Sequence, residues 1–414
     1  MDPFSQLPPE LIRQIIQSTD DFVGLESLLS ASPRVSHVFQ ASPHSLLQDV
    51  VTSNPMTTTP KIQKLFWNIA RIHKPPPVQC TSLDDYILLT TTPRESPSPS
   101  PPSSMVVSAH LARLMIQIAA QTQRLACLCL STLQRNFVAA VGASSTDSLA
   151  SEGGGTLSGS CRASKASEPF WWIEEYRVYW SLWHLRHYSD LRKAVEVLSP
   201  ARHDPQTRWS WPLNSIERLD AYGVWNEIHG FVAEWIWSVA VGLEECGLRS
   251  SSESGGREEL PLDDRERFLN ETTVPFFESF DLPQTSSSQD TAFKHVWCPP
   301  PVPDETPITR AWRGGLQRCG EPTGQTMLYR SHALMLTRMR PAVVDMMEIQ
   351  PYRRLGVLLW TTWRMYSVGL FPNNRPERTP APNGGFLEVN RKRVTAVRDM
   401  QSRWLVLVGK PPLE

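Results

Sequence analysis

The sequence lacks any excess of charge of one sign. Its 414 residues include 41 lysines and arginines against 42 aspartates and glutamates, which gives a formal net charge of -1. A chain balanced in this way creates no long-range field that would attract phosphate backbones or acidic membrane surfaces. Nucleic acid is therefore not an expected partner.

Targeting and membrane-spanning signals are also missing. The chain opens MDPF, without the basic and apolar regions of a secretory leader, and no stretch offers eighteen uncharged apolar residues. Residues 105–141 come closest, but Arg113 and Arg124 interrupt them, and we expect a buried core helix there. Seven cysteines, an odd number, do not indicate a disulfide framework. We expect a cytoplasmic or nuclear protein with reduced thiols and no membrane partner.

Enzyme motifs are scarce. Residues 320–326, GEPTGQT, are one residue short of a P-loop and have Gln325 where the phosphate-binding lysine is required. His184 and His187 could share a helix face but have no third ligand at metal spacing, and the pair Cys127-x-Cys129 lacks the two-residue spacer of redox and zinc motifs. The sequence predicts a non-enzyme with no cofactor, no metal and no catalytic residues.

The 36 prolines cluster with serine and glycine in segments that cannot pack a core, such as PRESPSPSPPSS at 93–104. These segments predict disordered connectors. The expected connectors are about 90–104, 142–167, 249–259, 281–308 and 372–385.

Between the connectors the apolar spacing is helical, and the alternation typical of strands is nearly absent. After residue 50, a first helix is marked by Ile62, Leu65, Phe66, Ile69 and Ile72. Further helical blocks are expected at 105–141, 169–198, 214–247, 262–280, 326–370 and 388–408, with breaks at Pro341 and Pro351. No fixed-period repeat is visible. We predict an all-α chain with a short N-terminal domain at 1–50 and an irregular multi-helix region at 51–414.

The N-terminal motif is LPPELIRQII at 7–16. Prolines suit the first turn of a helix, where a missing N–H costs nothing, and Glu10 lies near the positive end of the helix dipole. Three apolar sets at steps of three and four predict three short helices that share one core. The sets are Leu11, Ile12, Ile15 and Ile16; Leu25, Leu28 and Leu29; and, after Ser32-Pro33, Val35, Val38 and Phe39.

This arrangement resembles the F-box, a helical module that docks proteins onto the Skp adaptor of a cullin-RING ubiquitin ligase. The family pattern is a Leu-Pro entry followed by Glu-Leu/Ile, an Ile pair, a Leu-rich second helix and a third helix that ends in an aromatic residue. The turn ASPRV at 31–35 is similar to that of filamentous-fungal F-box-like proteins. The chain departs from the pattern at Phe39, where the family often has tryptophan, and at Gly24 in or just before the second helix.

The resemblance implies an adaptor-binding surface and a second, unknown partner, the protein to be ubiquitinated. The residues that it assigns to the adaptor are Leu7, Pro8, Leu11, Ile12, Ile15, Leu25, Leu28, Val35 and Phe39. We expect Leu7, Pro8, Ile12 and Phe39 to contribute to an apolar face that the N-terminal helices leave uncovered. The alternative is that 7–40 is the first hairpin of a larger α-domain.

A tryptophan-rich segment at 170–191 has its aromatic residues at helical spacing. This pattern favours a core helix over an aromatic groove that captures substrate, so Trp172, Trp180 and Trp183 should be mostly buried, with Trp225, Trp235 and Trp237 packing on the same centre.

The sequence as a whole predicts a non-catalytic F-box substrate adaptor. Two alternatives remain open: a helical interaction scaffold without ligase attachment, and an enzyme without a recognisable motif.

Overall fold

The computed structural model of the chain describes residues 2–74, 107–144, 164–198, 231–245, 350–370 and 402–409. Across these ranges the regular structure is helical and contains no strand, which confirms the predicted all-α fold. The helices are α1 (Pro9–Gln17), α2 (Phe22–Ala31), α3 (Pro33–Ala41), α4 (Pro43–Ser53), α5 (Pro60–His73), α7 (Ala109–Ala143), α9 (Trp172–Leu198), α11 (Phe231–Glu245), α15 (Gln350–Arg354) and α16 (Thr362–Ser367).

The N-terminal helices begin where proline and capping residues place them. A proline occupies the first turn of α1, α3, α4 and α5, where its missing N–H removes no intrahelical bond. Two of the remaining free amides are capped by side chains: Asp21 accepts from Gly24 N in α2, and Ser32 accepts from Val35 N in α3. These caps define separate short helices within a few residues of one another.

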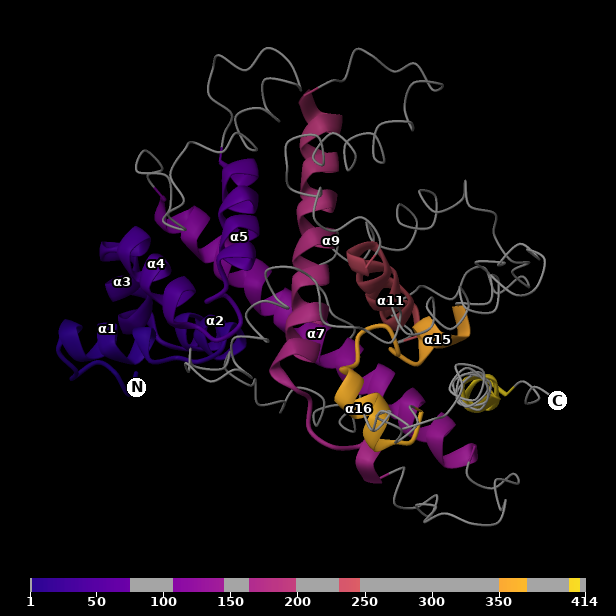
Figure 1. Cartoon of the computed structure of the whole chain (residues 1–414). Coiled ribbons are helices and arrows are strands. Elements are labelled where there is room, and N and C mark those ends of the chain that lie inside the picture. Colours follow the sequence, from indigo (N-terminus) through magenta and orange to yellow (C-terminus); the bar gives the residue numbers. More distant parts are fainter. Residues whose placement is uncertain are drawn as a thin grey trace, which may run out of the picture.

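Helix α7 connects the two ends of the described chain. In Figure 1 it runs diagonally from the group formed by α1 to α5 toward α11, α15 and α16, and it packs against α2, α4, α5, α9 and α11. By length and composition alone α7 could cross a membrane. Its apolar side chains are instead largely buried against these neighbours, as expected of a core helix.

One hydrophobic cluster extends from Ile12 in α1 to Leu407 near the C-terminus. It therefore includes residues from both sides of the predicted division at residue 50. Phe66 of α5 lies between the two regions, with its ring centroid 6.5 Å from Phe22 and 5.5 Å from Trp183. The N-terminal helices thus share their core with the helices that follow.

Two glycines allow close packing against α7. At Gly242 of α11, a Cβ would lie 2.8 Å from Cys129 Sγ. Gly356, with φ of +64°, has a left-handed backbone, and a Cβ there would lie 2.8 Å from the Trp360 ring. Larger residues at either site would separate the helices or displace the ring.

Several predicted boundaries are wrong. A fourth helix, α4, begins at Pro43, so three helices do not account for the first fifty residues. The connector predicted at 142–167 is helical at its ends, since α7 continues to Ala143 and 164–166 are helical. Within the predicted block 326–370, Pro351 lies in the first turn of α15, and the chain is not helical at 355–361.

Other sequence predictions fall partly or wholly outside the described residues. Wholly outside are the connectors 90–104, 249–259, 281–308 and 372–385 and the helical block 262–280. Of the blocks 214–247, 326–370 and 388–408, the structure describes only 231–245, 350–370 and 402–408.

The core role predicted for the tryptophan-rich helix is confirmed for Trp180 and Trp183, which are almost fully buried. Trp235 packs edge-on against Trp180, at 6.1 Å between ring centroids. Trp172 is less completely buried than these two, but it packs against the same core and stacks on Tyr176. Trp225 and the side chain of Trp237 lie outside the described part.

Candidate partner-binding surface

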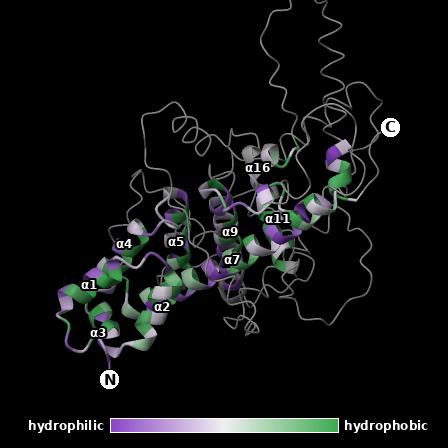
Figure 2. Cartoon of the chain, turned by 90° about the horizontal axis from the view of Figure 1, so that it is seen from below, coloured by the Kyte–Doolittle hydropathy of each residue, from purple (hydrophilic) through white to green (hydrophobic). Residues whose placement is uncertain are grey.

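Helix α1 has a buried side and an apolar side that faces solvent. Ile12 and Ile16 have no accessible surface, whereas Leu11 is 45% exposed and Ile15 is partly exposed. Pro8 is exposed and Leu7 is half-buried at the start of the same helix. Figure 2 shows α1 at the edge of the described chain, with hydrophobic residues along it.

The geometry of the α-helix explains this division. Successive residues are separated by about 100° around the axis, so Leu11 and Ile12 cannot both point directly at the core. Ile12 and Ile16, four residues apart, take the inner position, and Leu11 and Ile15 take the outer one. We call Leu7, Pro8, Leu11 and Ile15 the α1 edge.

The remaining residues predicted to bind an adaptor do not form an exposed face. Leu25, Val35 and Phe39 are fully buried, as is Ile12, and Leu28 is partly buried against the same core. The expectation of an uncovered face is therefore wrong for Ile12 and Phe39, because the helices pack these side chains inward. Pro8, Leu11 and Ile15 of the α1 edge come to the surface together, whereas Leu7, like Leu28, is partly buried against the core.

The N-terminal helices are positioned by polar contacts that the sequence pattern did not indicate. Gln123 of α7 is buried, and its Oε1 accepts from Phe22 N at 2.8 Å and Val23 N at 3.2 Å. A side chain 100 residues away thus satisfies the first amides of α2. Asn54 donates to Asp20 O at 2.9 Å and so fixes the turn before α2.

Asp2 holds the start of α3. Its carboxylate accepts from Ser32 Oγ at 2.8 Å and from Arg34 N at 3.0 Å. Hydrogen bonds lower the pKa of Asp2: the largest effect comes from the backbone amide of Phe4, and the amide of Arg34 and the hydroxyl of Ser32 add to it. Burial opposes them. This carboxylate complements the positive end of the α3 dipole and ties the N-terminal residues to it.

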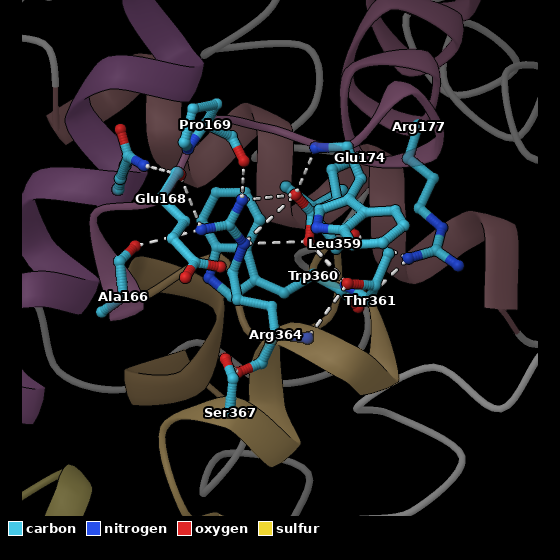
Figure 3. Close-up of polar contacts among 12 residues, drawn as sticks. Ala166, Glu168, Pro169, Glu174, Arg177, Leu359, Trp360, Thr361, Arg364 and Ser367 are labelled. Atoms are coloured by element: carbon cyan, nitrogen blue, oxygen red, sulfur yellow. Dashed lines mark hydrogen bonds and ion pairs between the residues drawn. The ribbon is translucent and has the colours of Figure 1, made fainter. Parts of the chain in front are cut away.

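A buried polar centre lies at the opposite end of α7, shown in Figure 3. Glu174, in the first turn of α9, accepts from Trp171 N at 3.0 Å, which caps its own helix. It also accepts from Thr361 N at 2.8 Å and Thr361 Oγ1 at 2.9 Å, at the start of α16. One carboxylate therefore lies at the positive ends of two helices.

Arg364 balances this charge. Its Nη2 lies 2.8 Å from Glu174 Oε2, and its Nε lies 3.0 Å from Glu174 Oε1. The other donors reach three carbonyls, those of Ala166, Glu168 and Pro169. The guanidinium also lies over two rings, 5.7 Å from the Phe170 centroid and 5.6 Å from the Trp360 centroid. With its donors and acceptors engaged, this centre joins three segments of the chain.

A second buried polar cluster connects α5, α7 and α9. Arg186 donates to Asp190 Oδ2 at 2.8 Å and to Gln121 Oε1 at 2.9 Å. His73 Nε2 lies 3.1 Å from Asp190 Oδ2, close in distance but without the alignment of a good hydrogen bond. Burial acts to raise the pKa of Asp190, but the adjacent imidazole and guanidinium outweigh it and lower that pKa.

The two histidines of α9 are kept neutral by burial. Burial lowers the pKa of His187 to about 4, with Asp190 opposing, and it lowers the pKa of His184 well below its ordinary value. The described residues contain no group of three side chains able to hold a metal ion. Burial also raises the pKa of Cys127 to about 12, so this thiol has little thiolate character.

Comparisons with family models, curated proteins and solved structures gave no match to the chain.

Proposed function

We propose that the chain is a non-catalytic substrate adaptor of the F-box type, which attaches a target protein to a Skp/cullin-RING ubiquitin ligase. The proposal rests on the order of the N-terminal motif and on one structural observation, the exposed α1 edge. The adaptor would cover this edge, and the helices after residue 50 would carry the target.

The exposure of Leu11 carries the proposal. Leu11 is a large apolar residue that leaves 45% of its surface in water, and a partner that covered this surface would gain the free energy of burying it. Ile15 lies four residues on, next to Leu11 on the same face of α1, and the exposed Pro8 immediately precedes the helix, so Leu11 is not an isolated apolar residue. A contiguous apolar edge on a helix fits a partner that buries it.

The described contacts also support a helical interaction scaffold without ligase attachment. Gln123 caps α2 from α7, and Arg124 pairs with Glu26 of α2 at 2.6 Å. These contacts make the first helices an integral part of a larger domain, which an independent docking module would not require.

The test compares adaptor binding by the wild-type chain and two variants. Leu11→Glu places a charge in the centre of the α1 edge, whereas Ala139→Glu adds the same charge at an exposed position of α7. Position 11 is the third residue of α1, where an acidic side chain suits the helix dipole, so the first variant should fold normally. Circular dichroism and thermal unfolding check this for both.

Titration calorimetry with a recombinant Skp-type adaptor then measures affinity. We expect the wild type and Ala139→Glu to bind equally and Leu11→Glu to bind more than tenfold more weakly, because a buried unpaired charge at an interface costs about 2 kcal/mol or more. No binding by the wild-type chain would refute the ligase attachment and leave the scaffold. Equal binding by all three proteins would show that the adaptor binds outside α1.

A further inference from the structure

The connection between α1 and α2 consists of Ser18, Thr19, Asp20 and Asp21. Ser18 and Asp20 are exposed, whereas Asp21 is partly buried and caps α2. Among the exposed serines and threonines of the described chain, only Ser18 has carboxylates at both the second and the third position after it. An accessible hydroxyl followed by acidic side chains suits a protein kinase whose substrate site is basic.

Ser18 also belongs to the face of α1 that carries the α1 edge. It follows Leu11 by seven residues and Ile15 by three, and residues at these spacings lie one above another on a helix. The Ser18 amide donates to the Gln14 carbonyl at 2.9 Å, so this C-cap residue keeps its helical position. A group attached to the Ser18 hydroxyl would therefore lie at the rim of the exposed apolar surface.

A phosphate at Ser18 would be in unfavourable surroundings. It would carry a charge of about −1.5 to −2 at neutral pH, at the negative end of the α1 dipole and close in sequence to two aspartates. The bond from the Ser18 hydroxyl to the Ile15 carbonyl, 3.1 Å long, would be lost. Arg13, the one basic residue of α1, lies on another face and donates to Ser42. The phosphate should therefore loosen the last turn of α1, and a partner covering the α1 edge would have to desolvate it.

We propose that an acid-directed protein kinase phosphorylates Ser18, which loosens the last turn of α1 and closes the α1 edge to its partner. ATP is the phosphoryl donor. A bond forms between Ser18 Oγ and the γ-phosphorus, the bond from that phosphorus to the bridging oxygen breaks, ADP leaves, and the hydroxyl proton passes to a base of the kinase. The effect on the partner rests on the proposed adaptor function, whereas the modification and its effect on α1 do not.

The first test measures the modification itself. The full chain is incubated with ATP and casein kinase II, an acid-directed kinase, and mass spectrometry of its peptides follows the phosphate on Ser18. Asp20→Asn removes one carboxylate and keeps the hydroxyl, so it should slow phosphorylation of Ser18 by about threefold or more. Glu10→Gln, which removes an exposed carboxylate at the other end of α1, should leave the rate unchanged. No phosphate on Ser18 of the wild type, or equal rates in the two variants, would overturn the proposal.

The second test measures the effect of the phosphate. The wild type and Ser18→Ala are both treated with the kinase, so they share any phosphate elsewhere in the chain and differ only at residue 18. Calorimetry with a recombinant Skp-type adaptor should show that the treated wild type binds more than about tenfold more weakly than treated Ser18→Ala. Backbone hydrogen exchange in the last turn of α1 should be faster in the treated wild type. Equal affinities of the two treated proteins would contradict the proposal.

Failure of the adaptor function can be distinguished from failure of this proposal. If the untreated wild type binds no adaptor, the adaptor function is refuted, and hydrogen exchange decides the effect of the phosphate. Faster exchange in the last turn of α1 in the treated wild type than in treated Ser18→Ala would support the effect on α1, and equal exchange would overturn it.

Discussion

The α1 edge and the Glu174–Arg364 centre place their side chains in opposite environments. At the α1 edge, apolar Leu11 is 45% exposed, whereas at the centre the charged Glu174 has no accessible surface. The buried charges are satisfied within the chain, by each other, by helix amides and by carbonyls. The exposed apolar surface of the α1 edge is not covered by other residues of the described chain.

This difference separates residues that hold the fold from residues that are available to a partner. A buried ion pair with full hydrogen bonding leaves no donor or acceptor for a ligand, so its contribution is to join α9 and α16. An exposed apolar edge contributes little to folding but can be buried by a second protein. Stability measurements should therefore be sensitive at the first region and insensitive at the second.

Glu174→Gln should give the largest effect. The change leaves the Arg364 guanidinium buried without a counter-charge, and removal of one partner of a buried pair costs about 3 to 5 kcal/mol. Urea unfolding measures this loss. The control is Glu168→Gln, which breaks an exposed ion pair with Lys165 and should cost less than about 0.5 kcal/mol. Similar small losses in both variants would show that the centre does not stabilise the fold.

The two sides of α1 should differ in the same way. Ile12→Ala removes a fully buried side chain and should lower the free energy of unfolding by about 2 to 5 kcal/mol. Leu11→Ala removes an exposed one and should change it by no more than about 0.5 kcal/mol. Chemical denaturation of the two variants beside the wild type decides this. Equal losses would mean that Leu11 belongs to the core.

The pH dependence of stability tests the burial of the two α9 histidines. His187 has a pKa of about 4 in the folded chain and an ordinary pKa of 6.5 when unfolded. Below pH 6.5 the unfolded chain therefore binds a proton that the folded chain does not, and stability falls as the pH drops toward 4. His184, whose pKa is also lowered, acts in the same direction.

At about 1.4 kcal/mol per pKa unit, His187 alone accounts for up to about 3 kcal/mol between pH 7 and pH 4. Asp190 adds nothing in this window, because its pKa is lowered from 3.8 and its contribution is lost only at lower pH. Urea unfolding at several pH values measures the slope, which should be smaller in His187→Gln. A free energy that stays constant from pH 7 to 4.5 would contradict neutral, buried histidines.

The local pattern of the sequence was sufficient to predict most of the described helices. Steps of three and four in the apolar residues and prolines in first turns mark α1, α3 and α9 within a few residues. The apolar stripe of α1 could not show which of Leu11 and Ile12 faces the core. That choice depends on the neighbouring helices, and both residues fit the helical period.

Contacts between distant segments could not be predicted. Gln123 caps α2 from about 100 residues away, and Arg364 pairs with Glu174 across 190 residues. Neither side chain belongs to a local motif, because its partner is determined by the packing of helices. The first turn of α9 carried one usable signal: two glutamates near a helix start indicate contacts with the dipole, although not with which further segment.

Backbone hydrogen exchange of the full chain with and without a recombinant Skp-type adaptor tests the central claim most directly. If the adaptor covers the α1 edge, exchange should slow across Pro9–Gln17 and remain unchanged across Trp172–Leu198, the helix that contains Glu174. Unchanged exchange in α1 at a saturating adaptor concentration would contradict the account, as would protection confined to α9.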